Sequence, residues 1–182
     1  MDDNIVRVVR VFAEVQIEWV LVGAHAVGLL TEPRATEDFD FIVDQRRLWQ
    51  LIKALEAEFG ELDMVDLGPA LRSRVLNIDL IRSGNHPLFA DALASSTAAS
   101  GWRSPSVEAL LALKFLAMIS PWRDRRKRAV DLADFIAVYT SQDPVDLDLA
   151  ALAALAAKVY PGAENELVEL LRRIDGGDQI EI

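Results

Sequence analysis

The 182-residue chain carries 19 basic and 29 acidic side chains, which gives a formal net charge of −10, and it contains no cysteine. This acidic balance argues against a protein that coats nucleic acid non-specifically, and the lack of cysteine excludes disulfides, thiol catalysis and cysteine-ligated zinc. No apolar stretch is long enough to cross a membrane, and the acidic start Met1-Asp2-Asp3 is unlike a signal peptide. We therefore expect a cytoplasmic protein without a membrane partner.

Helices and strands alternate in the predicted structure of residues 1–103. Hydrophobic periodicity predicts helices at about 4–15, 24–30 and 46–59, and strands at about 19–22, 38–43, 62–67 and 73–81. Beyond residue 104 only helices are predicted, at about 105–119, 122–140, 146–159 and 162–174. The pattern indicates the α+β class, with a mixed sheet flanked by helices over 1–103 and a helical bundle over 104–182.

Two aspartates, Asp38 and Asp40, alternate with apolar residues in the predicted strand at 38–43. Successive side chains of a strand point to opposite faces, so these two carboxylates share one face. Neighbouring carboxylates repel each other unless a cation or a proton lies between them. A pair of Mg²⁺ ions that binds a phosphate is the commonest reason for such an arrangement.

A third aspartate, Asp79, lies in the apolar alternation of the predicted strand at 73–81. Adjacent strands of a sheet could bring it beside Asp38 and Asp40. Three carboxylates carry enough negative charge to hold two divalent ions, with water and substrate phosphates as the remaining ligands.

Residues around the first aspartate pair are candidates for phosphate contacts. Gly23 lies between a predicted strand and a predicted helix, where the missing side chain lets a phosphate approach the backbone, although simple turn geometry would also explain a glycine. Arg34 and Thr36 precede the aspartates and could contact phosphates, or could instead brace the loop.

The segments Trp19–Val27 and Pro33–Phe41 resemble the signature of the nucleotidyltransferase superfamily, and more closely its minimal nucleotidyltransferases and AbiEii-type toxins. The resemblance consists of a hydrophobic strand, a glycine turn, a spacer and an acid-apolar-acid strand. It implies a nucleotidyltransferase-like fold in which Asp38, Asp40 and Asp79 bind two Mg²⁺ ions. It also implies that Gly23 and Ala24 form the phosphate-binding turn. Ala24 replaces the family's usual Ser or Gly, so we expect altered rather than abolished phosphate binding.

The helical half carries a further resemblance to that subgroup, in Leu111–Ala117 and Arg126–Asp134. It implies that Lys114 contacts triphosphate oxygens and that the basic run Arg123–Arg128 holds the NTP or an RNA acceptor. The residues themselves also allow a lysine that extends along an apolar helix to reach solvent, and a solvated basic helix face. Asp131 and Asp134 could be ion-pair partners of nearby basic residues.

The sequence thus predicts a Mg²⁺-dependent enzyme that transfers an NMP from an NTP to a hydroxyl. The acceptor could be a tRNA end, a protein side chain or a small molecule such as an aminoglycoside. The resemblance also implies that the protein could be the toxin of a toxin–antitoxin pair, with an antitoxin as its partner. Two alternatives stay open, which are a catalytically inactive binding module with the same fold and a metal-dependent phosphohydrolase.

Overall fold

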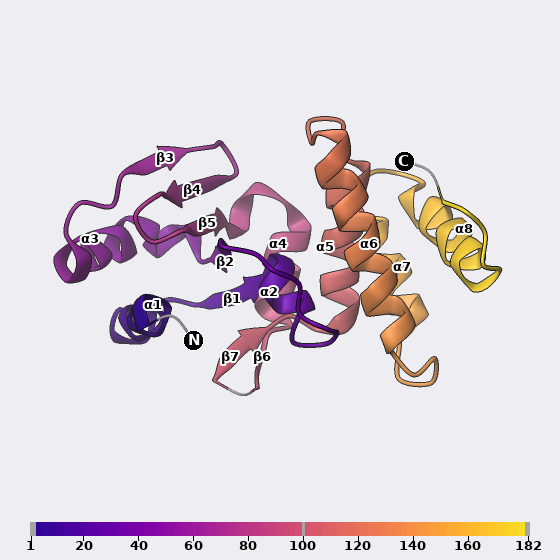
Figure 1. Ribbon diagram of the computed structural model, residues 1–182, viewed down its shortest axis with the longest axis horizontal. Helices are drawn as coiled ribbons and strands as arrows, with labels where there is room; N and C mark the ends of the chain where they lie inside the picture. The colour runs from indigo at the N-terminus through magenta and orange to yellow at the C-terminus, as the bar shows by residue number, and fades with distance from the viewer. Residues whose placement is uncertain (1–2, 100, 181–182) are drawn as a thin grey trace. The chain divides into compact units, whose positions relative to one another are not determined.

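The computed structural model describes residues 3–99 and 101–180 (Figure 1). The chain divides into two compact units, of which the first comprises Met1–His25 and Arg34–Pro105 and the second comprises Ala26–Pro33 and Ser106–Ile182. This division differs from a single boundary at residue 103 because a short segment near the N-terminus belongs to the second unit. Each unit is described separately.

The first unit contains a five-stranded mixed sheet. Its elements in chain order are α1 (Asp3–Glu14), β1 (Trp19–Val22), the start of α2 (Gly23–Val27), β2 (Phe39–Val43), the 3₁₀ turn η1 (Gln45–Arg47), α3 (Leu48–Phe59), β3 (Met64–Asp66), β4 (Ala70–Ser73), β5 (Ile78–Arg82), the 3₁₀ turn η2 (Ser83–Asn85), α4 (Pro87–Ala94), β6 (Thr97–Ala99) and β7 (Trp102–Ser104). The strand order is β1-β2-β5-β4-β3, and β6 and β7 form a separate hairpin. Only the central pair β2–β5 is parallel among the described strand pairs.

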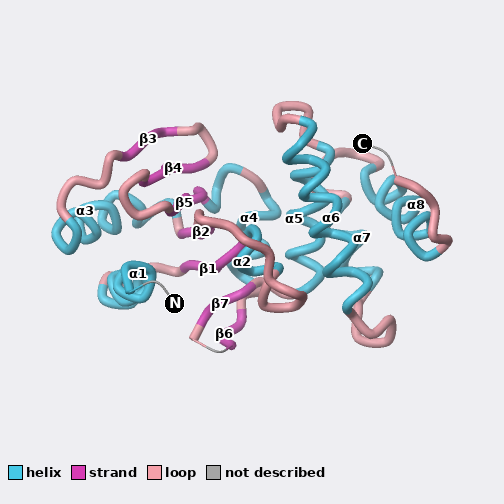
Figure 2. The backbone as a smooth tube through the Cα atoms, viewed as in Figure 1, coloured by secondary structure: helices cyan, strands magenta, loops and turns pink. Residues whose placement is uncertain are grey.

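Aromatic side chains join α1 to one face of the sheet. The ring of Phe12 lies 5.1 Å from that of Phe41 on β2 and 5.6 Å from that of Trp19 on β1, in edge-to-face contacts. Such contacts add to the apolar area that these large residues bury. Helix α3 packs beside α1 (Figure 2). Because the alternation of β2 turns Phe41 toward this core, Asp40 lies on the opposite face.

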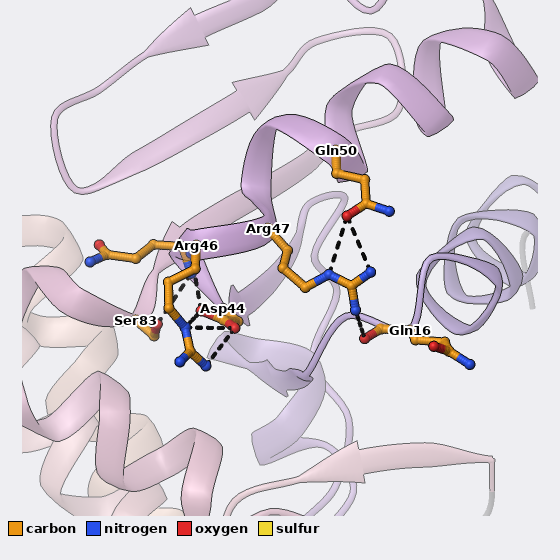
Figure 3. Close-up of polar contacts among 7 residues, drawn as sticks. Gln16, Asp44, Arg46, Arg47, Gln50 and Ser83 are labelled. Atoms are coloured by element: carbon orange, nitrogen blue, oxygen red, sulfur yellow. Dashed lines mark hydrogen bonds and ion pairs between the residues drawn. The ribbon is translucent and has the colours of Figure 1, made fainter.

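The end of β2 is tied to the start of α3 by a polar cluster (Figure 3). The Asp44 carboxylate accepts hydrogen bonds from the backbone N–H and the Nε of Arg46, at 3.0 and 2.9 Å, and thereby caps η1. These bonds to Arg46 lower the pKa of Asp44, against the opposing effect of burial. Arg47 donates to the backbone oxygen of Gln16 and to the side chain of Gln50. The cluster therefore fixes β2 from its carboxyl end.

The second unit is helical, as predicted. It contains α5 (Val107–Ile119), α6 (Arg125–Ser141), α7 (Leu149–Ala156) and α8 (Ala163–Asp175), which correspond to the four predicted helices. Ser106, Asp124 and Asp148 each cap the N-terminus of the following helix through a side-chain oxygen. No helix of the described residues is long and apolar enough to cross a membrane. The predicted α+β class is confirmed.

One predicted strand is wrong. The run expected as a single strand at 73–81 is interrupted at residues 74–77 by a turn in which Asn77 has a φ of +51°. Asn is one of the few residues that adopts this conformation readily, so it allows the chain to reverse. The segment forms the ends of two antiparallel strands, β4 and β5, and β4 begins earlier than expected at Ala70. The elements α4, β6 and β7 were not predicted, and the expected helix at 24–30 ends at Val27.

The cap of α4 generates a prediction about acid stability. His86 Nδ1 accepts the N–H of Leu88 at 3.1 Å, and burial lowers the pKa of His86, although the charge of Asp91 opposes this. The unfolded chain therefore binds more protons below about pH 6.5, and stability falls as the pH drops through this range. His86→Asn keeps a capping oxygen without a titrating group. The midpoint of urea unfolding should therefore fall less between pH 7.5 and 5.5 in this variant than in the wild type.

His25, the other histidine of the chain, also has a lowered pKa, so part of the slope should remain in His86→Asn. An unchanged slope in His86→Asn would show that protonation of the cap does not contribute.

Candidate active site

The strand register places two of the predicted acidic residues directly side by side. Asp40 on β2 is the register partner of Asp79 on β5, and Asp79 is in turn the partner of Arg72 on β4. Partners on adjacent strands point to the same face of the sheet, so the three side chains form one row across its centre. Asp79 is buried.

Asp38 lies one residue before the start of β2 and has two contacts. Its Oδ1 accepts a hydrogen bond from Thr36 Oγ1 at 2.8 Å, and its Oδ2 lies 3.8 Å from the guanidinium of Arg72. The predicted phosphate contact of Thr36 stays a prediction, and the observed contact orients the Asp38 carboxylate. Asp38, Asp40 and Asp79 form the acidic row of the sheet, and Arg72 contacts Asp38 and Asp79 within it.

Arg72 is a site residue that the sequence did not reveal. Its Nε and one terminal nitrogen donate to the two oxygens of Asp79 at 2.7 and 2.5 Å, in a paired geometry. This pairing raises the pKa of Arg72, as do the charges of Asp79, Asp38 and Asp40, while burial opposes the rise. Arg72 was missed because the predicted strand began only at residue 73, whereas β4 begins at Ala70. An Asn that favours a turn before the third aspartate was the available signal for the extra strand.

Gly23 is required by its contact with the acidic row. Its φ is +66°, and a Cβ built on it would lie 1.9 Å from Asp40 Oδ2. The backbone turn between β1 and α2 therefore lies directly against the carboxylate, which a larger residue would displace. Ala24, the next residue, is buried in the core, and Arg34 is exposed on the following loop.

The donor set of the acidic row suits a hard cation. It offers only carboxylate oxygens, which Mg²⁺ prefers, and the close approach of Gly23 keeps Asp40 in place. Over residues 3–99 and 101–180, however, no group of three or more Asp, Glu, His or Cys side chains is arranged to hold a metal ion. In this arrangement Arg72 donates to both oxygens of Asp79.

Phe39, at the start of β2, is the centre of an aromatic stack. The ring of His25 is stacked on Phe39 with centroids 3.6 Å apart, and Phe39 is in turn stacked against Trp102 at 6.0 Å. Burial lowers the pKa of His25, the charge of Asp38 opposes this, and Arg34 adds to the lowering. The imidazole therefore favours its neutral form.

Lys114 lies in a buried ion network of the second unit. Its Nζ donates to Asp131 Oδ1 at 3.1 Å and to Asp134 Oδ2 at 2.6 Å, and all three side chains are buried. Arg123 Nε lies 2.5 Å from Asp131 Oδ2. The expectation that the two aspartates are ion-pair partners of basic residues is confirmed. The predicted contact of Lys114 with triphosphate stays a prediction, and its amine here joins α5 to α6.

The basic run occupies the first turn of α6 and the residues before it. Arg125, Arg126 and Lys127 are exposed, and Trp122 just before them is 94 % exposed. Cations at a helix N-terminus oppose the helix dipole, and Asp124 is the acidic cap that offsets them. This segment therefore presents positive charge and an aromatic ring to solvent.

Comparison with solved structures identifies the fold. The solution structure of the antibiotic-resistance factor ANT(2'')-Ia aligns over 96 % of this chain and 96 % of that chain, with a TM-score of 0.56 and 16 % identity. A nucleotidyltransferase-like protein from Paracoccidioides brasiliensis aligns over 97 % and 94 %, with a TM-score of 0.54 and 19 % identity. ANT(2")-Ia in complex with adenylyl-2"-tobramycin aligns over 86 % and 97 %, with a TM-score of 0.57 and 16 % identity. The chain has the nucleotidyltransferase fold.

No family model and no curated protein matches the sequence. The likeness to the solved structures therefore concerns the fold, and the roles of individual residues in this nucleotidyltransferase fold rest on the geometry described above.

Replacement of Gly23 tests the contact with Asp40. A non-glycine residue at positive φ costs about 1–2 kcal/mol by itself. Gly23→Ala should lower the free energy of unfolding by more than this, because its Cβ would overlap the Asp40 carboxylate. The matched control is Gly68→Ala, which has a φ of +86° and nothing within 4 Å of the built Cβ. Equal losses in urea unfolding would contradict the predicted contact.

Removal of the Lys114 amine tests the buried network. Lys114→Met removes the amine that bonds to Asp134 inside the network and should lower the free energy of unfolding by about 3–5 kcal/mol in urea titrations. Lys53→Met, at an exposed position of α3, is the control and should be close to neutral. The double variant Lys114→Met/Asp134→Leu removes one charge of each sign and should recover part of the loss. A loss in Lys114→Met no larger than in Lys53→Met would contradict the role of the network.

Proposed function

We propose that the protein is a Mg²⁺-dependent nucleotidyltransferase that transfers an NMP from an NTP to a hydroxyl group of an acceptor. The observation that carries the proposal is the pair Asp40 and Asp79, in register on adjacent strands, with Asp38 on the same face and Gly23 directly against Asp40. The nucleotidyltransferase fold agrees with it.

In the proposed reaction the acceptor oxygen bonds to the α-phosphorus, the bond from that phosphorus to the β-phosphate oxygen breaks, and pyrophosphate leaves. The hydroxyl proton goes to a carboxylate of the site or to water. Asp38, Asp40 and Asp79 would hold two Mg²⁺ ions, which supply Lewis-acid activation of the phosphate and of the attacking hydroxyl. Thr36 holds Asp38 in orientation, and Gly23 keeps the turn close to Asp40.

Further residues are assigned to the nucleotide in the proposal. The turn Gly23-Ala24 would accommodate a phosphate against its backbone, and Arg34, on an exposed loop, would add a positive charge. Lys114 would reach a triphosphate only after leaving Asp131 and Asp134. Its assignment therefore requires a rearrangement within the second unit.

The acceptor is proposed by class. The exposed basic segment 122–128 suits an RNA end, because phosphates bind cations and a base stacks on an exposed tryptophan. One solved neighbour is a complex with adenylyl-2"-tobramycin, which supports a small molecule as a second class. A protein side chain is the third class. A toxin role with an antitoxin partner rests on the sequence resemblance alone.

A second candidate is a non-catalytic binding module with this fold. The observation that favours it is Arg72, which takes both oxygens of Asp79. A cation supplied by the chain itself would then replace the metal.

Transfer of label from an NTP distinguishes these functions. We expect the protein, incubated with Mg²⁺, a cell extract and each of the four α-labelled NTPs in turn, to label one class of acceptor, resolved on RNA and protein gels and by thin-layer chromatography. Asp40→Asn should reduce the rate at least about 100-fold, because it removes a metal-binding carboxylate. Glu37→Gln, which removes a neighbouring exposed carboxylate, should retain the rate.

Two results would contradict the proposed transfer. Label that persists in Asp40→Asn would place the reaction elsewhere, and release of phosphate or pyrophosphate without labelled acceptor would indicate a phosphohydrolase. Absence of any nucleotide binding would favour the non-catalytic module.

A further inference from the structure

Arg72 is placed by the sheet itself. Its register partner on β5 is Asp79. On the other side of β5, the register partner of Asp79 is Asp40 on β2. The guanidinium therefore projects over the acidic row, with Asp79 in a two-point bond and Asp38 at 3.8 Å.

The charges explain why a basic residue is needed there. Three carboxylates of one row repel each other, and the repulsion grows as water is excluded. Asp38, Asp40 and Asp79 all act on Arg72 as stabilising negative charges. The chain thus carries its own counter-cation for a cluster that would otherwise need one from solution.

The other arginines of β4–β5 and the adjoining turn have different partners. Arg74 lies near Asp63 and Arg82 pairs with Asp66, and both of these aspartates are more than half exposed. Their ion pairs are surface contacts, which contribute little. Arg72 differs because the carboxylate that it holds is buried.

We propose that Arg72 is a built-in competitor for the metal site, and that a divalent cation binds Asp79 only when Arg72 releases it. This rests on the proposed metal role of the three aspartates. Both oxygens of Asp79 are engaged by the guanidinium, and two cations cannot share them without repulsion. The Arg72 side chain is 41 % exposed and that of Asp79 is 10 % exposed, so the arginine is the partner that can move into solvent. Arg72 thereby sets how much cation is needed to assemble the site.

Nuclear magnetic resonance on the wild-type protein tests the release. The Nε–H of Arg72 donates to Asp79, so without metal its proton signal should be protected from exchange. Mg²⁺ should abolish this protection, whereas the Nε–H of Arg46, bonded to Asp44 away from the row, should not change. Unchanged protection of Arg72 while Mg²⁺ binds would overturn the proposal and leave the proposed function intact.

Cation affinity gives the matching test on variants. Arg72→Gln should bind Mn²⁺ at least about fivefold more tightly than the wild type in calorimetry, and Arg74→Gln, which loses an exposed pair, should stay within about twofold. Arg72→Lys keeps the charge without the two-point bond, and its affinity should fall between the two. Affinity that is equal or weaker in Arg72→Gln would contradict competition. Binding in Arg72→Gln but not in the wild type would support it and favour the non-catalytic module, and binding in neither protein would overturn the metal site as well.

Discussion

The parallel pairing of β2 with β5 is the constraint on which the candidate site depends. It places Asp40 against Asp79 and so creates a repulsion at the centre of the sheet. The antiparallel pairing of β5 with β4 supplies the compensation, because it brings Arg72 beside Asp79. The glycine turn after β1 adds a steric limit, since it leaves Asp40 little room to move away. Two strand pairings and one glycine turn thus determine where the acidic residues lie and how their charge is balanced.

The parts of the site that could be predicted are those that depend on local sequence patterns. Alternation of acid and apolar residues was sufficient to place Asp38 and Asp40 on one face, and a short apolar run followed by glycine was sufficient for β1 and its turn. The arginine could not be found in this way, because its role depends on a hairpin. Four residues that read as the continuation of a strand instead reverse the chain, and the choice is made by long-range pairing rather than by local preference. The missed strand and the missed arginine have the same cause.

The helical unit illustrates a different limit of prediction. The four helices follow from their periodicity and caps, yet the periodicity does not reveal what Lys114 contacts. An apolar helix with one lysine is compatible with a side chain that reaches solvent or with one that is paired internally. Internal pairing of the lysine requires the two aspartates that lie three residues apart on α6. These aspartates come within bonding distance of Lys114 only when α5 and α6 pack together. The lysine and the aspartates are visible in the sequence, but only the packing of the two helices shows that they form ion pairs.

In both units a basic side chain therefore neutralises clustered aspartates. The two clusters differ in how far that basic side chain is exposed to solvent. The Lys114 side chain is 7 % exposed, so exchange of its amine for an external cation would first require the helices to separate. Arg72 is accessible enough to leave without disturbing the sheet, because its strand is held by backbone pairing on both sides. An ion network of the first kind holds helices together, whereas one of the second kind can be opened by a competing cation. The acidic row of the sheet, rather than the buried network, is therefore the cluster in which the proposed exchange with an external cation can occur.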